Sequence, residues 1–183
     1  MVSLETPVCD AGWRAPSFEL PGIDGRAHSL DSIIGANGTL VMFICNHCPY
    51  VKAIADRLSE DMGLLINAGI GVAAINSNDS EAYPEDSFEN MKTFAAKHAF
   101  PFPYLIDQTQ EIGRAYGAIC TPDFFGFNSH VELQYRGRLD ESGRNPSPPD
   151  AKRELVEAML GMIKTGKGPE IQSPSIGCSI KWR

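Results

Sequence analysis

Two cysteines, Cys45 and Cys48, stand where an apolar run gives way to a helical pattern. The run, residues 40–44, is typical of a strand that is buried on both faces. The first amide groups of a helix have no partner inside the helix and lie at the positive end of its dipole, so they favour a thiolate over a thiol. The pair is therefore a candidate redox dithiol with a sulfur that is nucleophilic at neutral pH.

The order of the two cysteines predicts their roles. At a helix start Cys45 lies at the open end and is expected to attack a partner, whereas Cys48, one turn inward, attacks the mixed disulfide and releases the product. His47 is expected to add positive charge or a hydrogen bond to the Cys45 thiolate, which makes the disulfide more oxidising. An ordinary surface histidine at a helix start is the alternative for His47.

A Cys-x-x-Cys pair can also be half of a zinc site. The sequence has no second Cys-x-x-Cys and no His-x-His cluster, so we expect no metal ligands. We also expect no cofactor, because the electrons can travel on cysteine sulfurs. Binding of a metal or a partner at the dithiol, without catalysis, is retained as an alternative function.

Length and charge narrow the class of protein. The 183 residues, 43% hydrophobic, predict one domain spanning residues 1–183. Lys and Arg number 16 against 23 Asp and Glu, a net charge of −7 that argues against a nucleic-acid partner. Neither a signal peptide nor an apolar stretch long enough to span a membrane is evident, so we expect no membrane partner. The five cysteines do not form a disulfide framework, which favours a reducing compartment, the cytoplasm.

The segments before and after the dithiol predict a sheet with helices. Residues 1–13 are expected to be an extended arm, and residues 18–30 a hairpin around an Asp-Gly turn. A helix is predicted to start at Cys48 or just before it, because proline at position 49 is tolerated only in the first turn. Residues 69–76 form a second buried strand.

The second half of the chain completes an α/β pattern. A helix face over residues 88–95 is followed by a short strand, 104–107, and residues 124–137 alternate as an antiparallel hairpin. A closing helix is predicted over 151–164, and the tail, 166–183, is expected to be irregular. This order predicts a central mixed β-sheet flanked by helices, with the hairpin of residues 18–30 as an N-terminal extension.

This order, with Cys-x-x-Cys ending the first core strand and Thr121-Pro122 just before the hairpin, resembles the thioredoxin-like superfamily. The N-terminal hairpin is similar to that of its redoxin branch, which includes the alkyl hydroperoxide reductase/thiol-specific antioxidant proteins. The resemblance covers roughly residues 14–165. Segments 46–51, 135–140 and 177–182 are also similar to bacterial thioredoxin-family proteins of unassigned substrate.

The resemblance implies roles for several residues. Cys45 and Cys48 match the nucleophilic and resolving cysteines, and Pro122 matches the cis-proline. Such a proline turns the Thr121 backbone toward the dithiol as an exposed edge for an extended substrate, and Thr121 and Asn46 are the expected substrate-binding residues. The partners implied are a protein thiol or disulfide and an unidentified redox partner.

Two further cysteines are candidate auxiliary thiols. Cys120 would lie close to the dithiol, although at a strand entrance a small buried hydrophobic residue is the main expectation. Cys178 could act as a third thiol that resolves a mixed disulfide if the tail folds back. A structural or free thiol is the alternative for Cys178.

The sequence also departs from the thioredoxin pattern. Asn46-His47 replaces glycine-proline between the cysteines, and Thr39 replaces a buried acid. Val51 replaces the glutamate of cytochrome-maturation relatives. No carboxylate proton acceptor for Cys48 is therefore identified, which leaves His47 or water.

A thiol–disulfide oxidoreductase is the leading prediction, and a thiol peroxidase is its rival among enzymes. Cys48-Pro49 is similar to the peroxidatic cysteine of peroxiredoxins, where Cys48 would become a sulfenic acid. That family also has a threonine, a proline and an arginine around the cysteine. The corresponding residues here are Cys45, Val41 and Pro122, so the peroxidase constellation is incomplete.

Overall fold

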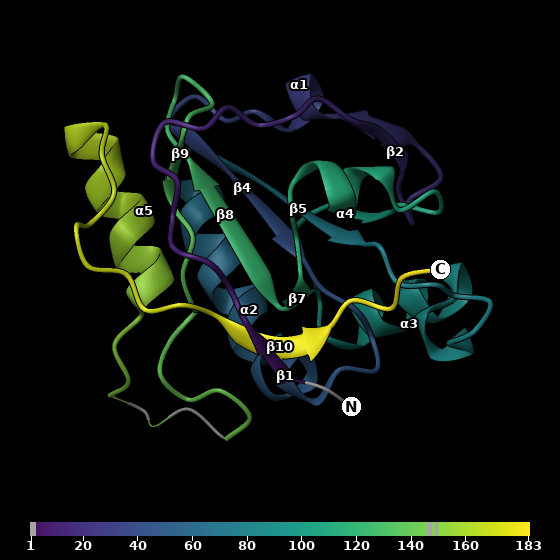
Figure 1. The fold of residues 1–183 in the computed structure, drawn as a ribbon. Coiled ribbons are helices and arrows are strands. Elements are labelled where there is room, and N and C mark those ends of the chain that lie inside the picture. Colours follow the sequence, from purple (N-terminus) through teal and green to yellow (C-terminus); the bar gives the residue numbers. More distant parts are fainter. Residues whose placement is uncertain (1–2, 146–147, 149) are drawn as a thin grey trace.

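The strand β4 (Gly38–Phe43) is the centre of a five-stranded sheet with the order β6-β5-β4-β8-β9 (Figure 1). The computed structural model describes residues 3–145, 148 and 150–183. Strands β4, β5 and β6 run parallel, while β8 pairs antiparallel with both β4 and β9. The other strands are β5 (Ile70–Asn76), β6 (Tyr104–Ile106), β8 (Asp123–Phe127) and β9 (Leu133–Tyr135). The predicted mixed sheet is confirmed.

Helices cover both faces of this sheet because β4 is apolar on both sides. Leu40 and Met42 point into a core shared with three helices, α2 (Pro49–Asn67), α3 (Phe88–Lys97) and α5 (Glu154–Thr165). The alternate residues Val41 and Phe43 point into a second core, toward α1 (Leu30–Ile33) and the segment that follows α4 (Glu111–Ala115). All six residues of β4 are buried, which fixes the place where the chain leaves the sheet toward α2.

One local prediction is confirmed, and another misses by one residue, since α2 was predicted to start at Cys48 or just before it. β2 (Glu19–Pro21) and β3 (Ala27–Ser29) pair as the expected N-terminal hairpin. Helix α2 begins at Pro49 with Cys48 as its N-cap, and proline takes the first-turn position that it tolerates. A short 3-10 helix, η1 (Pro84–Asp86), follows β5 and precedes α3.

The two ends of the chain differ from the prediction. The tail, 166–183, was expected to be irregular, but it contains β10 (Ile176–Ser179). This strand lies between β1 (Ser3–Glu5) and β7 (Cys120–Thr121) in a separate three-stranded sheet (Figure 1). The arm, 1–13, thus holds a paired strand, while residues 1 and 2 lie outside the described residues. A short strand containing glycine and serine shows no apolar alternation, so its distant partners were not evident from the sequence.

Strand β10 is held at both ends. The amide of Thr6 donates to the carbonyl of Ser175 at 2.9 Å, and the amide of Ile180 donates to the carbonyl of Ile119 at 3.1 Å. The approach to β7 is close, because a Cβ atom at Gly177 would lie 2.1 Å from the Thr121 carbonyl oxygen. Glycine is therefore required for this pairing.

Among the described residues, no helix combines the length and the apolar character needed to cross a lipid bilayer.

We predict that Gly177→Ala displaces β10 from β7, because the added methyl would overlap the Thr121 carbonyl. The free energy of unfolding should fall by about 1–3 kcal/mol, the usual cost of overpacking. Hydrogen exchange at the Ile180 amide, which bonds to Ile119 across this sheet, should accelerate.

Gly161→Ala is the matched control, because a Cβ atom there meets nothing within 4 Å. In the middle of α5 that change should stabilise the protein by roughly 0.5–1 kcal/mol. Unchanged exchange at Ile180 in Gly177→Ala would contradict the prediction.

Candidate active site

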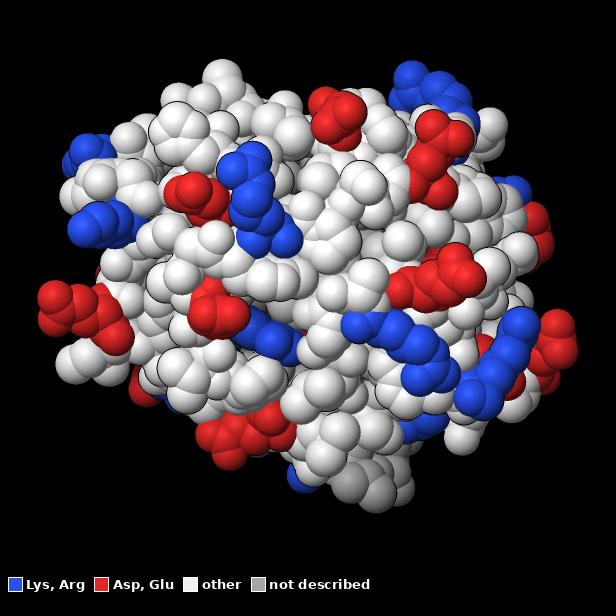
Figure 2. Space-filling view, turned by 45° about the horizontal axis from the view of Figure 1, so that its top comes forward, with Lys and Arg blue, Asp and Glu red and all other residues white. Residues whose placement is uncertain are grey.

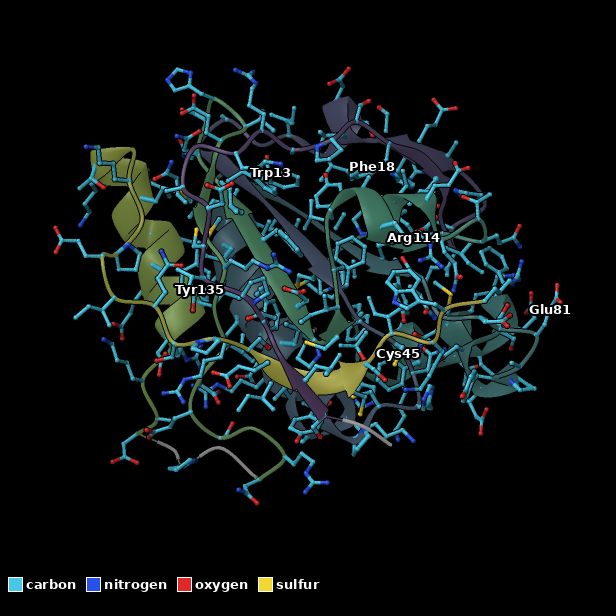
Figure 3. The ribbon with its side chains drawn as sticks, viewed as in Figure 1. Trp13, Phe18, Cys45, Glu81, Arg114 and Tyr135 are labelled. Carbon is cyan, nitrogen blue, oxygen red and sulfur yellow. The ribbon has the colours of Figure 1, made fainter. Side chains whose placement is uncertain are left out.

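Cys45 and Cys48 lie in the turn between β4 and α2, and each thiol shifts the pKa of the other (Figure 3 labels Cys45). Both are free thiols, with side chains that are 1% and 0% exposed. The expectation that Cys45 lies at an open end is therefore wrong. The sulfurs are covered because β7 and β10 lie beside them, through Thr121 and Cys178.

Thr121 contacts both sulfurs. Its Oγ1 lies 3.3 Å from Cys45 Sγ, and its carbonyl oxygen lies 3.1 Å from Cys48 Sγ, where it accepts a hydrogen bond when Cys48 is protonated. The peptide bond to Pro122 is cis, as the resemblance implied. However, the Thr121 edge is not exposed for a substrate, because β10 pairs with it and Cys178 stands opposite Thr121.

Burial and hydrogen bonding move the pKa values of the two thiols in opposite directions. Burial raises the pKa of Cys45, and the nearby Asp86 carboxylate adds to that increase. The pKa of Cys48 is lowered to about 5, first because the Cys45 thiol donates to it and then because Cys178 and the Val51 amide also donate. Burial opposes this shift. The pair thus holds one thiolate at neutral pH, on the sulfur at the N-cap of α2.

His47 is not a surface residue at a helix start. Its side chain is 11% exposed, and its Nδ1 lies 2.6 Å from Oδ2 of Asp86. This bond raises the pKa of His47, while burial opposes the increase. The ring stacks on Tyr83 at a centroid distance of 5.5 Å and an interplanar angle of 7°.

Asn46 is also committed to contacts inside the protein. Its Nδ2 donates to the carbonyl of Glu85 at 3.0 Å, and its Oδ1 accepts from the Tyr104 hydroxyl at 3.0 Å. The residue is buried. Its side chain therefore positions the turn, which differs from the substrate-binding role expected from the sequence.

Asp86, which the sequence analysis did not identify, links these residues. It is fully buried in η1, and its Oδ1 accepts the backbone amides of Asn46 at 2.8 Å and His47 at 3.3 Å. The predicted topology contained a signal for Asp86, because the parallel strands β4 and β5 end at the same edge of the sheet. The polar segment 77–86, which follows β5, must then lie beside the Cys-x-x-Cys turn.

The two auxiliary cysteines occupy different environments. Cys178 is buried beside Cys48, to which its thiol donates, and burial raises the pKa of Cys178 to about 12. Cys120 is fully buried, and its thiol donates to the Pro122 carbonyl at 3.6 Å. Burial raises its pKa as well, which confirms the expected small buried hydrophobic residue.

The donor atoms of Cys45, His47 and Asp86 lie within 4.8 Å of one another. Three such atoms are one fewer than a structural zinc site has. Two of the three residues are already joined by the Nδ1–Oδ2 hydrogen bond of 2.6 Å, so a metal ion would have to replace that proton. As it stands, the cluster is a hydrogen-bonded dyad beside a thiol.

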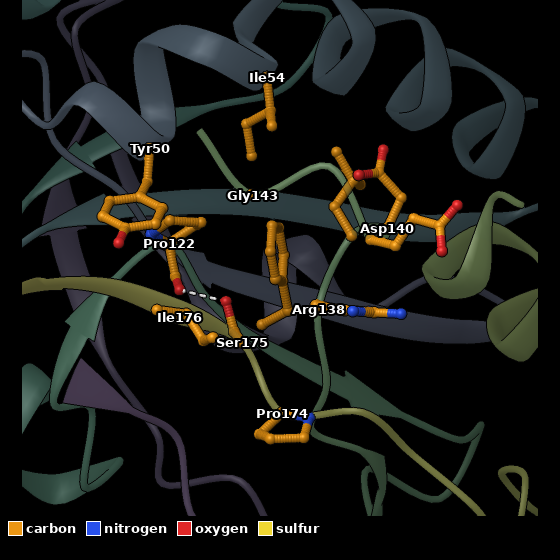
Figure 4. A pocket seen from close by; sticks show the side chains of 12 residues that line it. Tyr50, Ile54, Pro122, Arg138, Asp140, Gly143, Pro174, Ser175 and Ile176 are labelled. Atoms are coloured by element: carbon orange, nitrogen blue, oxygen red, sulfur yellow. Dashed lines mark hydrogen bonds between the residues drawn. The ribbon is translucent and has the colours of Figure 1, made fainter. Parts of the chain in front are cut away.

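A small cavity of about 70 Å³ is lined by Pro122 together with residues of α2 and of the tail (Figure 4). Tyr50, Ile54 and Phe124 give it an apolar lining, and the Ser175 hydroxyl donates to the Pro122 carbonyl at 2.7 Å. Neither sulfur lines this cavity. On the face seen in Figure 2, acidic and basic side chains are interspersed without a large patch of one sign.

Comparison with solved structures identifies the fold. The chain is 44% identical to an uncharacterized conserved protein from Geobacillus kaustophilus, with a TM-score of 0.93 over 100% of this chain and 97% of that one. The thioredoxin domain of a thiol-disulfide oxidoreductase from Bacteroides vulgatus gives a TM-score of 0.58 at 12% identity, over 69% of this chain and 86% of that one. The fold is thus thioredoxin-like.

Sequence comparison points to the same group of proteins. "Thiol-disulfide oxidoreductase ResA" from Halalkalibacterium halodurans is 24% identical over 84% of this chain and 77% of that protein. "Putative peroxiredoxin Rv2521" from Mycobacterium tuberculosis is 26% identical over 73% of this chain and 80% of that protein. The AhpC/TSA family profile matches residues 11–141. The protein is therefore an oxidoreductase that belongs to the AhpC/TSA family.

Proposed function

We propose that this protein is a thiol–disulfide oxidoreductase that cycles a Cys45–Cys48 disulfide on protein thiols or disulfides. The observation that carries the proposal is that both sulfurs, at the start of α2, contact Thr121, the residue before the cis-proline: Cys45 Sγ lies 3.3 Å from its Oγ1 and Cys48 Sγ lies 3.1 Å from its carbonyl oxygen. We place the protein in the cytoplasm on the sequence argument. Its substrate and redox partner are not identified by these residues.

The chemistry needs only the two sulfurs and one proton. The Cys48 thiolate attacks a substrate disulfide, a new S–S bond forms, and one substrate sulfur leaves as a thiolate. Cys45 then loses its proton and attacks the Cys48 sulfur, so the second substrate sulfur leaves and takes a proton. The protein dithiol is oxidised and the substrate disulfide is reduced by two electrons. The lowered pKa favours Cys48 as the first nucleophile, the reverse of the order predicted from the sequence.

Single-cysteine variants test both the cycle and the order. Wild-type protein should accelerate the reduction of insulin by dithiothreitol, and both Cys45→Ser and Cys48→Ser should lose turnover because neither can close the disulfide. In a single reaction with dithionitrobenzoate, Cys45→Ser should form a mixed disulfide at least tenfold faster than Cys48→Ser.

If Cys48→Ser instead formed the mixed disulfide faster than Cys45→Ser, Cys45 would be the attacking sulfur, and the proposed disulfide cycle would still stand. Turnover retained in both variants would refute the cycle itself. Metal analysis of reduced protein belongs with this test, since a stoichiometric ion without reductase activity would support the non-catalytic alternative.

A thiol peroxidase is the second candidate, and one observation favours it. Cys48 combines a lowered pKa with complete burial, so a small oxidant reaches it more readily than a protein does. Attack of the thiolate on a peroxide, with one proton, gives a sulfenic acid on Cys48 and an alcohol or water. The Cys45 thiol then displaces water from that sulfur, and the disulfide forms.

Stopped-flow mixing with hydrogen peroxide tests this candidate. A peroxidase should retain peroxide consumption in Cys45→Ser when an external thiol is supplied, and lose it in Cys48→Ser. Because the thiolate is the nucleophile, the rate should be constant from pH 8 to 6 and fall about tenfold per pH unit below about 5. Slow, pH-independent thiol loss would exclude this activity.

We propose Cys178 as an auxiliary thiol, since it is buried and donates to Cys48. In Cys45→Ser, mild oxidation should then produce a Cys48–Cys178 disulfide, which peptide mapping detects. Cys120→Ser is the control, because the Cys120 thiol bonds to the Pro122 carbonyl instead. If Cys178→Ser keeps full turnover and the disulfide is not formed, Cys178 has only a structural role.

A further inference from the structure

We propose that Asp86 is a positioning residue of the dithiol: its buried carboxylate orients His47 so that this histidine takes the proton that Cys45 loses when the disulfide forms. The proposal rests on the disulfide cycle described above. It makes His47, one of the two proton acceptors that the sequence left open, the acceptor for Cys45, and it assigns a role to a buried acid on a different element, η1.

The hydrogen bonds of Asp86 occupy both of its oxygens. Oδ1 accepts the amides of Asn46 and His47, at 2.8 and 3.3 Å. Oδ2 lies 2.6 Å from His47 Nδ1 and accepts Asn78 Nδ2 at 2.7 Å. Three of these partners can only donate, which suits a carboxylate, because an ionised carboxylate only accepts. With Asp86 ionised, His47 carries a proton on Nδ1.

The second ring nitrogen of His47, Nε2, is the atom that would accept the proton from Cys45. Within the described residues, Nε2 is buried and has no hydrogen-bond partner. Buried polar atoms without a partner are rare, and each calls for an explanation. Stacking on Tyr83 and the bond to Asp86 hold the ring in place, and a ring nitrogen of His47 lies within 4.8 Å of the Cys45 sulfur. An oriented basic nitrogen with a carboxylate behind it is the arrangement used in general base catalysis.

The electrostatics explain why Cys45 needs such a base. The carboxylate of Asp86 lies within 4.8 Å of the Cys45 sulfur, so its negative charge disfavours a thiolate there. Cys45 therefore keeps its proton until the mixed disulfide on Cys48 is ready to be resolved. His47 then accepts the proton, the His47–Asp86 pair becomes neutral overall, and Cys45 attacks. The departing substrate thiolate recovers the proton from His47, so the step balances.

Other titratable groups face this dyad from several elements. The Cys48 thiolate raises the pKa of His47, and the Lys181 ammonium, which lies over the Tyr83 ring at 5.9 Å, lowers it. Asp86 has the larger effect on the His47 pKa. Among the described residues these groups are Cys45 and Cys48 in the turn, Tyr83 before η1, Tyr104 on β6, and Cys178 and Lys181 at the tail.

The test compares Asp86→Asn with Glu85→Gln. Both remove one negative charge from η1, but Glu85 is exposed whereas Asp86 is buried. Titration of the His47 ring by NMR, assigned with His47→Gln, should show its pKa lowered by roughly one to three units in Asp86→Asn and unchanged in Glu85→Gln. The rate of product release from a preformed mixed disulfide on Cys48 should fall roughly tenfold or more at pH 7 in Asp86→Asn.

A structural role alone would not move the His47 titration in this selective way. Equal titrations in Asp86→Asn and wild type, or equal release rates, would overturn the proposal. If Asp86→Asn fails to fold, the wild-type protein decides: the pKa of His47 should be lower in the oxidised protein, because the Cys48 thiolate that raises it is gone. An unchanged value would also overturn the proposal. These titrations need no turnover, so they stay separate from failure of the disulfide cycle itself.

Discussion

The antiparallel pairing of Thr121 with Cys178 is the contact on which the site depends. Thr121 touches both sulfurs, so whatever strand pairs with it must lie against the dithiol. By supplying β10 from its own C-terminal segment, the chain fills a backbone edge that would otherwise be open to other strands. The same pairing removes water from Cys45 and Cys48.

Without water around the sulfurs, a thiolate is destabilised, and the surrounding hydrogen-bond donors compensate for only one negative charge. A buried thiolate is unfavourable unless hydrogen bonds are directed at it. Cys48 receives such bonds from the Cys45 thiol, the Cys178 thiol and the Val51 amide. Cys45 has the Asp86 carboxylate nearby instead, which opposes a second negative charge. The pair is thus divided into one thiolate and one thiol by its neighbours, in a way that the spacing of two cysteines does not specify.

The sequence was informative where structure is set locally. The apolar run of β4 and the proline after Cys48 predicted the start of α2 to within one residue, and the resemblance supplied the cis-proline. The exposure of Cys45 and the secondary structure of the tail were mispredicted, because both depend on β10, whose pairing partners are distant in sequence. Periodicity detects a buried face, but a four-residue strand held by its backbone leaves no such pattern.

The position of Asp86 shows how topology adds what local pattern lacks. Since β4 and β5 are parallel neighbours, the segments after them leave the sheet at the same edge, and a polar side chain in one segment can bond to the backbone of the other.

The pairing of β10 with β7 also affects which substrates can reach the dithiol. A protein substrate must displace the Cys178 pairing to reach Thr121, whereas a small oxidant or thiol needs only a passage to the sulfur. The stability of that one pairing therefore sets which class of partner the buried thiolate can meet.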